Sequence, residues 1–138
     1  EYQTIKTRLR QQAYLTKGIH VFFSDLRETP PHRDAFYFER GIVSYVEHLN
    51  AGKDLAGDVF YVEKEVPEGN IEIALQYNNA FQEVIYGFAN NIYTPEGGMH
   101  VTGFKSALTR SLNTYARKQN FLKESSLKCL LRLSVASR

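Results

Sequence analysis

The spacing of apolar residues in the first half of the chain changes from helical to extended and back. Between Tyr2 and Thr16 apolar residues recur mostly every three or four positions, which predicts an amphipathic helix closed by Gly18. Residues 19–23 form an apolar, β-branched run typical of a strand, and residues 35–39 can return as its hairpin partner. One apolar face over residues 42–49 indicates a short helix. The predicted order is helix, two strands, helix.

The second half begins with three further extended segments, residues 59–66, 70–76 and 82–89. Turn signals separate them, which predicts an antiparallel meander. The middle segment alternates between two sets of residues, Ile71, Ile73 and Leu75 in one and Glu72, Ala74 and Gln76 in the other. Because side chains alternate between the two faces of a strand, the aliphatic set is expected to face the core and the other set to tolerate water.

A long helix is predicted after these strands. The segment Thr94–Gly98 contains one proline and two glycines, which excludes both a helix and a central strand there. The helix is expected to begin near His100 or Thr102 and to end at about Gln119. Its expected inward stripe is Phe104, Ala107, Leu108, Ser111, Leu112 and Tyr115, with Tyr115 in the core and its hydroxyl at an edge. The whole pattern predicts an α+β fold, a mostly antiparallel sheet with helices on one face.

Composition limits the class of protein. The chain has 138 residues, 43% of them hydrophobic, which suffices for one domain with its own core. Its formal net charge of +2 does not by itself indicate a nucleic-acid-binding protein. The single cysteine, Cys129, excludes an internal disulfide framework. No apolar run or signal-peptide pattern is apparent, so no membrane association and a cytoplasmic location are expected.

The stretch from Phe88 to Arg117 carries the most specific motif. It reads FANNIYTPEGGMHVTGFKSALTRSLNTYAR, and its distinctive motif residues are Asn90, Asn91, Glu96, Gly97, Gly98 and His100. This stretch resembles the transducer domain of the B subunit of bacterial DNA gyrase or topoisomerase IV. Three earlier segments, IKTRLRQQAYLTKGI, ERGIVSYVEHLN and IEIALQYN, resemble the same family in the same order. Agreement at so many non-periodic positions makes chance similarity an inadequate explanation.

The resemblance implies a ribosomal-protein-like βαβ transducer fold. Residues 1–17 would be a helix entering from an ATP-binding domain, residues 18–124 the transducer domain, and residues 125–138 an atypical tail. The implied role is to couple ATP binding and hydrolysis to DNA strand passage, without a complete active site of its own. ATP and Mg²⁺ would serve the parent enzyme, with no cofactor in this chain. The implied partners are DNA, the remainder of the B subunit and the A subunit, and homodimerisation stays open.

The C-terminal tail departs from the family. After Glu124 the family continues through a further strand to a loop whose lysine contacts ATP, whereas this chain ends in SSLKCLLRLSVASR. A frameshift in the gene and a genuine tail are both open interpretations. Leu127, Leu130, Leu131 and Leu133 could form an amphipathic helical turn or an exposed apolar end. The chain also begins without methionine, which fits a piece of a longer protein better than processing.

Most motif residues have a structural interpretation. Gly97 and Gly98 are expected to allow positive φ in a tight turn before the long helix, with anion binding at the helix start as the alternative. His100 is expected to cap or pack, because no second ligand or adjacent nucleophile accompanies it. Asn90 and Asn91 are expected to satisfy loose backbone groups at a strand end. The sequence therefore predicts no catalytic and no metal-binding residue.

The basic residues of the long helix are the candidates for DNA contact. Lys105, Arg110, Arg117 and Lys118 are expected to face away from the apolar stripe, with Lys123 just beyond them. A solvated surface is the ordinary explanation of such an edge. The family's transducer, however, lines a cavity through which a duplex passes, and phosphate contacts there would attract DNA without reading its sequence. Arg110 is the first choice. The N-terminal basic residues Lys6, Arg8, Arg10 and Lys17 are expected to face solvent.

Two other classes of function compete with this interpretation. A free-standing DNA-binding or protein-interaction module could use the same fold, and salt-dependent DNA binding lost on charge reversal at Arg110 and Arg117 would favour it. An ordinary metabolic enzyme ranks lowest, because no nucleophile–base pair or metal cluster is apparent.

Overall fold

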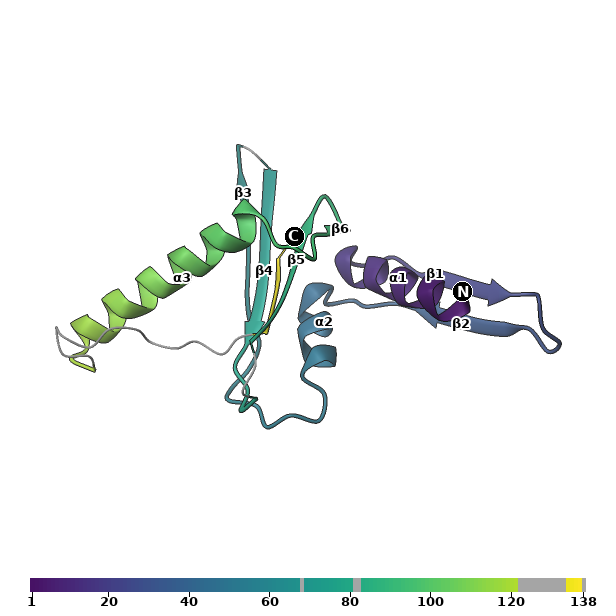
Figure 1. The fold of residues 1–138 in the computed structure, drawn as a ribbon, viewed down its shortest axis with the longest axis horizontal. Helices are drawn as coiled ribbons and strands as arrows, with labels where there is room; N and C mark the ends of the chain where they lie inside the picture. The colour runs from purple at the N-terminus through teal and green to yellow at the C-terminus, as the bar shows by residue number, and fades with distance from the viewer. Residues whose placement is uncertain (68, 81–82, 122–133, 138) are drawn as a thin grey trace.

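The computed structural model describes residues 1–67, 69–80, 83–121 and 134–137 (Figure 1). The elements in chain order are α1 (Tyr2–Leu15), β1 (Val21–Asp25), β2 (His32–Phe36), α2 (Ile42–Leu49), β3 (Phe60–Val66), β4 (Gly69–Gln76), β5 (Val84–Ala89), β6 (Ile92–Tyr93), α3 (Met99–Lys118) and β7 (Ser134–Ser137). Helix periodicity and the capping glycines placed the helices correctly to within a few residues. The four leucines of the predicted tail helix, and Lys123, lie outside the described residues.

The first helix packs on a separate two-stranded hairpin. Strands β1 and β2 pair antiparallel, with Val21 opposite Phe36. At the start of α1 the ring of Tyr2 stacks on Phe23 at 5.3 Å, and one turn later Lys6 forms an ion pair of 2.7 Å with Asp34. Figure 1 shows α1 and the hairpin extending together to one side of the larger sheet.

The larger sheet has five strands in the order β3-β4-β7-β5-β6. Strand β4 pairs antiparallel with β3 and β7, β5 pairs antiparallel with β6, and only β5 and β7 run parallel. The predicted meander is therefore wrong at one place, because β5 does not lie beside β4. Strand β7, from the far end of the chain, occupies the position between them. No local pattern in residues 70–89 reveals a strand that is inserted from about 50 residues downstream.

The main core lies between the helices α1 and α2 and one face of the sheet. Its buried side chains are Tyr14, Leu15, Ile42, Val43, Tyr45, Val46, Ala74 and Phe88. The ring of Tyr14 stacks on Phe38 at 3.6 Å and on Tyr45 at 4.9 Å. Burial of this much aromatic and aliphatic surface is the main favourable contribution to holding α1 against α2 and the sheet.

Both faces of β4 are buried, and not the aliphatic face alone. Leu75 is buried as predicted, but Glu72, Ala74 and Gln76, which were expected to tolerate water, are buried as well, and Ile71 is 44% exposed. The reason is that the polar side chains on this face have partners inside the fold. Glu72 meets Lys17 and Tyr61, and Gln76 bonds to Asn50. Hydrogen-bonded polar groups can be buried at little cost, so hydrophobic alternation failed to predict the burial of this second face.

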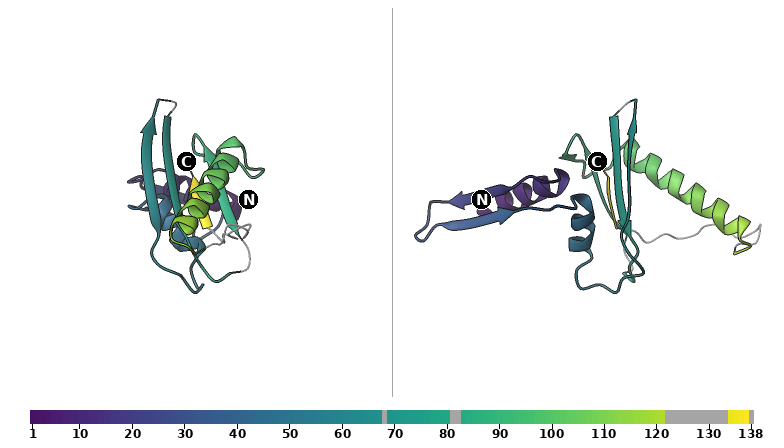
Figure 2. Two further views of the ribbon diagram at one scale, coloured as in Figure 1. Left: turned by 90° about the vertical axis from the view of Figure 1, so that its left-hand side faces the viewer. Right: turned by 180° about the vertical axis from the view of Figure 1, so that it is seen from behind.

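The α+β class and the mostly antiparallel sheet are confirmed, but the helices cover both faces of the sheet. Ala74 and Phe88 belong to the core beneath α2, while Leu75 and Ile85, on the other face, pack against Phe104 and Leu108 of α3. Figure 2 shows α2 and α3 on opposite sides of the strands. The prediction of helices on one face differs from the structure in this respect.

Only the first half of α3 contacts the sheet. From its contacts at Phe104 and Leu108 the helix extends away from the strands (Figures 1 and 2). None of its residues is buried, and Tyr115 is 56% exposed. The prediction that Tyr115 is a core residue is therefore wrong. Its sequence pattern correctly places Tyr115 on the apolar side of the helix. The pattern does not show that the helix leaves the sheet before this residue.

Candidate functional site

The loop before α3 is tied to strand β5 by a short chain of hydrogen bonds. The Thr94 hydroxyl donates to the carbonyl oxygen of Gly87 at 2.9 Å, and the backbone N–H of Thr94 donates to the same oxygen at 2.9 Å. His100 Nε2 lies 3.2 Å from Thr94 Oγ1, so the first turn of α3 is linked to the strand through Thr94. These contacts set where α3 begins and in which direction it extends.

Close backbone packing reinforces this joint. A Cβ atom at Gly87 would lie 2.5 Å from Val101 Cγ2 and 2.9 Å from His100 Nε2, so a larger residue there would force α3 or its side chains to shift. Gly97 and Gly98 have φ values of +79° and +154°, and residues other than glycine rarely adopt this range of backbone conformation. The motif glycines thus permit a tight turn and a close helix–strand contact.

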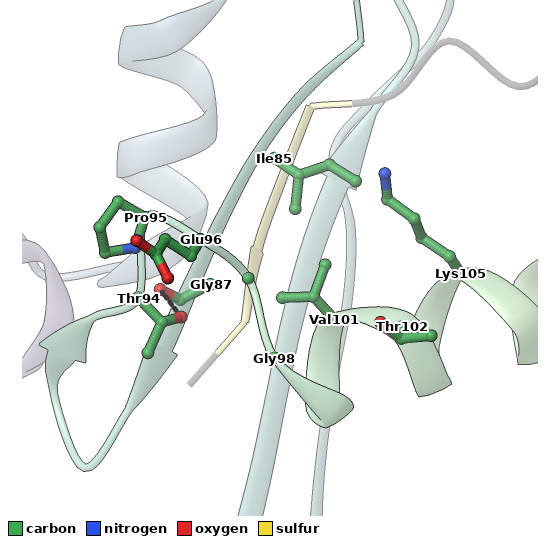
Figure 3. A pocket seen from close by; sticks show the side chains of 10 residues that line it. Ile85, Gly87, Thr94, Pro95, Glu96, Gly98, Val101, Thr102 and Lys105 are labelled. Atoms are coloured by element: carbon green, nitrogen blue, oxygen red, sulfur yellow. Dashed lines mark hydrogen bonds between the residues drawn. The ribbon is translucent and has the colours of Figure 1, made fainter.

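A pocket of about 310 Å³ opens beside this loop, and Figure 3 shows Glu96 on its loop side and Lys105 on its α3 side. Two groups that could receive an anion there are already engaged. The backbone N–H of Gly97 donates to the carbonyl oxygen of Thr94 at 2.9 Å. The ammonium group of Lys105 lies 2.5 Å from Glu83 Oε1. These contacts favour a structural turn over anion binding at this loop.

Asn90 and Asn91 form the two-residue turn between β5 and β6. Ala89 pairs with Ile92 across it, and the two asparagines have φ values of 50° and 63°. Two consecutive positive φ values define the hairpin turn whose twist matches paired strands, and asparagine adopts it readily. The carbonyl oxygen of Asn91 also accepts a hydrogen bond of 3.0 Å from Gln12 of α1. The motif asparagines therefore act through their backbone conformation.

Helix α3 presents two basic residues on its open side. It has 20 residues and contains no aspartate or glutamate. Arg110 and Arg117 are seven residues apart, which places them on the same side about two turns apart. That side lies opposite Leu108, which faces the sheet. Arg117 and Lys118 lie in the last turn, where cations also stabilise the helix dipole.

The four DNA-contact candidates therefore do not lie on one edge. Lys105 lies beside the apolar stripe of the helix and is paired with Glu83 on the sheet side. Arg110, Arg117 and Lys118 are exposed on the part of α3 that extends from the sheet. The expectation that Lys105 faces away from the stripe is wrong.

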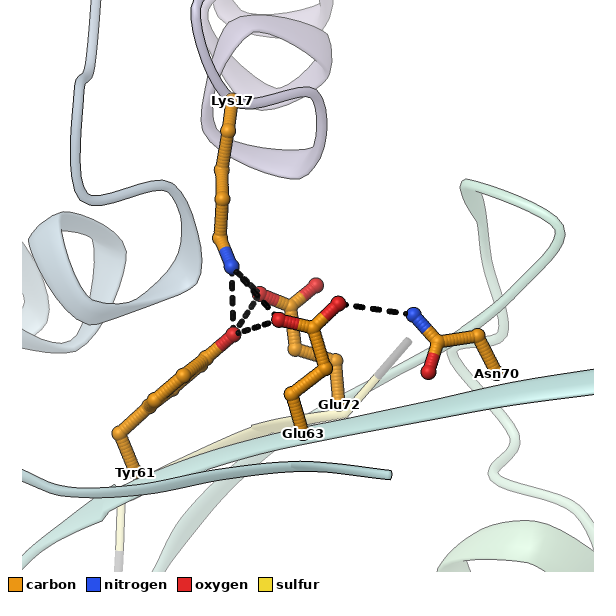
Figure 4. A network of polar contacts seen from close by, with 5 residues as sticks. All are labelled: Lys17, Tyr61, Glu63, Asn70 and Glu72. Atoms are coloured by element: carbon orange, nitrogen blue, oxygen red, sulfur yellow. Dashed lines mark hydrogen bonds and ion pairs between the residues drawn. The ribbon is translucent and has the colours of Figure 1, made fainter. Parts of the chain in front are cut away.

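A polar network joins the end of α1 to the sheet (Figure 4). Lys17 Nζ lies 2.9 Å from Glu72 Oε1, 3.1 Å from Glu63 Oε2 and 2.5 Å from the Tyr61 hydroxyl. Asn70 Nδ2 donates to the other oxygen of Glu63 at 2.9 Å. Burial opposes protonation of Lys17, but its hydrogen bonds to Tyr61, Glu72 and Glu63 prevail and raise its pKa.

The network shifts the pKa values of two further groups. Burial raises the pKa of Tyr61 to about 12, with Glu63 and Glu72 adding to the rise and Lys17 opposing it. Hydrogen bonds from Asn70, Tyr61 and Lys17 lower the pKa of Glu63 to about 2. Lys17 is thus a cation and Glu63 an anion across the physiological pH range.

The N-terminal basic residues were predicted to face solvent, and Arg8 and Lys17 are indeed exposed, but Lys6 and Arg10 are partly buried and several of these charged groups have partners. Lys17 contacts the buried Glu72, and Lys6 pairs with Asp34. The guanidinium of Arg10 lies over the ring of Phe36 at 5.2 Å. The carboxylates and rings involved lie far downstream in the sequence, so the helical pattern of α1 contained no signal for these contacts.

Within the described ranges, no three histidine, cysteine, aspartate or glutamate side chains gather as a metal ion would require. A search of the same residues for membrane spans finds no helix that is long and apolar enough to cross a bilayer.

Comparison with known proteins identifies the family. The sequence model described as DNA gyrase B matches residues 41–129, which is more than half of the chain. The chain belongs to the DNA gyrase B family. The matched range contains α2, strands β3 to β6 of the larger sheet and α3, together with the loop that joins α3 to β5.

Curated gyrase B proteins align over most of the chain. The chain is 48% identical over 126 residues to the DNA gyrase B protein of Halalkalibacterium halodurans and 42% identical over 125 residues to that of Enterococcus faecalis. These alignments cover 91% and 90% of the chain but 20% of each relative. The chain therefore corresponds to about one fifth of the length of these gyrase proteins.

Solved gyrase B structures share the fold. The 43K ATPase domain of Thermus thermophilus gyrase B, in complex with an aminocoumarin, aligns with a TM-score of 0.80 and 30% identity over 99% of this chain and 39% of that one. The B subunit of Myxococcus xanthus DNA gyrase aligns with a TM-score of 0.82 at 20% identity, over 99% of this chain and 43% of that one. The gyrase B fold therefore extends to α1 and the β1–β2 hairpin as well.

Proposed function

We propose that this chain is the transducer segment of a gyrase B-type subunit of a type II DNA topoisomerase, and that it couples a nucleotide-dependent movement on its N-terminal side to DNA held beside α3. Family membership and alignment with part of a gyrase B ATPase domain support this role. The remainder of the B subunit, the A subunit and DNA are the partners in this proposal. A free-standing module with the same fold is not favoured, because the chain aligns throughout with segments of longer gyrase proteins.

The observation that carries the proposal is the form of α3. One end of the helix is fixed to the sheet by Phe104, Leu108 and the Thr94 linkage, and the rest extends with arginines on its open side and no acidic residue. A helix of 20 residues is about 30 Å long, which is enough to lie along several base pairs of a duplex. Arginines on an acid-free helix suit contact with phosphates that is independent of sequence.

ATP and Mg²⁺ belong to another part of the subunit in this proposal. Among the described residues no acidic cluster suits Mg²⁺, and the loop amide and the lysine beside the pocket are engaged within the chain. The residues described here would supply the mechanical link between that nucleotide site and DNA, and no step of the hydrolysis itself.

The test uses a full-length B subunit that carries this segment, assembled with its A subunit. Arg110→Glu and Arg117→Glu, singly and together, are expected to lower the affinity for a DNA duplex and the DNA-dependent part of ATP hydrolysis. Replacing each arginine by alanine should reduce the slope of log K against log salt concentration by about 1. Arg33→Glu, an exposed charge reversal on β2, is the matched control. Equal effects of the Arg33 and α3 variants, or no effect of any, would reject DNA contact through α3.

A further inference from the structure

The three hydrogens of the Lys17 ammonium group match the three acceptors around it. The acceptors are Glu72 Oε1, Glu63 Oε2 and the Tyr61 hydroxyl oxygen, all within 3.1 Å. An ammonium group has three donors and no acceptor, so this geometry uses its whole capacity. A side chain that extends from the end of one helix to two strands is thereby held at its tip.

The two carboxylates of the network differ in burial, and this decides which contact is important. The side chain of Glu72 is 1% exposed, whereas those of Lys17 and Glu63 are 37% and 45% exposed. An exposed ion pair contributes little to stability. Removing one partner of a buried ion pair is strongly unfavourable. The contact of Lys17 with the buried Glu72 is therefore expected to contribute more than its contact with the exposed Glu63.

The path of the Lys17 side chain is also confined. A Cβ atom at Gly41, just before α2, would lie 2.7 Å from Lys17 Cγ and 3.1 Å from Cε. Gly41 has a φ of +57°, so glycine is favoured there on conformational grounds as well. The ammonium group lies 4.7 Å from the centre of the Tyr61 ring. The lysine stem thus passes between the start of α2 and strand β3.

The ion pair between Lys17 and Glu72 is connected to α3 through strand β4. Glu72 and Leu75 lie on opposite faces of β4, three residues apart. Leu75 packs with Phe104 and Leu108, which hold the start of α3. A displacement of α1 that pulls on Lys17 would act on β4 at Glu72, and β4 is one of the two strands that α3 packs against. The chain of contacts from α1 to α3 is continuous.

We propose that Lys17 is a positioning residue that links α1 to the sheet through Glu72 and so transmits movements of α1 to α3. This inference rests on the proposed coupling function and assigns its mechanical link to one ion pair. Lys17 contacts neither nucleotide nor DNA in this role. It acts by fixing the orientation of α1 relative to β4.

The test measures coupling instead of activity alone. In the full-length subunit assembled with its A subunit, Lys17→Met and Glu72→Gln are expected to raise the number of ATP molecules hydrolysed per DNA supercoil introduced, roughly 2- to 30-fold. Lys17→Arg, which keeps a cation, should restore most of the coupling. In the double variant Lys17→Met/Glu72→Gln, the ATP-to-supercoil ratio should rise by less than the two single effects combined, because the cation and the anion are both absent.

Lys6→Met is the matched control, because it also removes an α1 lysine that pairs with a carboxylate, on the hairpin instead of the sheet. The control should leave the ATP-to-supercoil ratio unchanged. A ratio that is unchanged in folded Lys17→Met and Glu72→Gln, or that rises equally in Lys6→Met, would overturn the inference. If only the Lys17 inference fails, charge reversal at Arg110 and Arg117 still impairs the DNA-dependent ATP hydrolysis. If the proposed function fails, neither set of variants has an effect.

Discussion

Asn50 and Gln76 form a hydrogen-bonded amide pair inside the fold, with Asn50 Nδ2 donating to Gln76 Oε1 at 2.9 Å. Both residues are buried, Asn50 at the end of α2 and Gln76 at the end of β4. Gln76 Nε2 donates in turn to the carbonyl oxygen of Gly57 at 3.0 Å, and Asn78 Nδ2 donates to Asn50 Oδ1 at 2.9 Å. The pair therefore fixes α2, β4 and the loop before β3 relative to one another.

The two amides of this pair should not contribute independently to the free energy of unfolding. Gln76→Leu and Asn50→Leu each remove one hydrogen-bond partner of a buried amide group, at an expected cost of about 1–3 kcal/mol. The double variant should be less destabilised than the sum of the two by about 1 kcal/mol, since the pair itself is then absent. Urea unfolding of the three variants measures this. Additive losses would show that the two residues stabilise the fold independently.

The contact between Gly87 and α3 predicts a steric effect. Gly87→Ala places a Cβ atom within 2.5 Å of Val101 Cγ2 and 2.9 Å of His100 Nε2, so α3 must shift from β5. Overpacking of this kind should cost about 1–3 kcal/mol of unfolding free energy. Val101→Ala in the same chain should restore part of the loss by making room.

Gly103→Ala is the control for this prediction. Gly103 lies within α3, and nothing lies within 4 Å of a Cβ atom placed there. Alanine in a helix interior should stabilise the protein by roughly 0.5–1 kcal/mol. Opposite signs for the two glycine variants in thermal unfolding would support the close helix–strand contact, and equal signs would contradict it.

The environment of Glu63 predicts a dependence of stability on pH. Hydrogen bonds from Asn70, Tyr61 and Lys17 lower its pKa from 4.5 to about 2. Because the pKa is lower in the folded state, the carboxylate stabilises the fold fully above about pH 4.5, and this contribution is lost as the pH falls through about 2. Asn70→Ala removes the first of these hydrogen bonds and should raise the pKa of Glu63. A titration of the Glu63 carboxyl carbon by NMR measures this shift, and an unchanged midpoint in the variant would contradict the assigned cause.

Local patterns predicted the helices well, but only one of the two buried faces of β4. The periodicity of apolar residues and the glycines expected near the helix ends predicted α1, α2 and α3 close to their observed bounds. In β4 the same reasoning expected the face with Glu72 and Gln76 to tolerate water, because it gave no weight to the partners that these residues find elsewhere in the fold. The motif around Gly97 and His100 identified the family correctly, but its joint with Gly87 became visible only in three dimensions.

The helices, the turn glycines and the membership of the gyrase B family follow from residues close together in the chain or from a motif of fixed spacing. Three other features became visible in three dimensions: β7 separates β4 from β5, Lys17 meets a buried Glu72, and α3 extends from the sheet with Arg110 and Arg117 on its open side. Each of these depends on contacts between segments far apart in sequence, where burial and pairing of polar groups outweigh local preference.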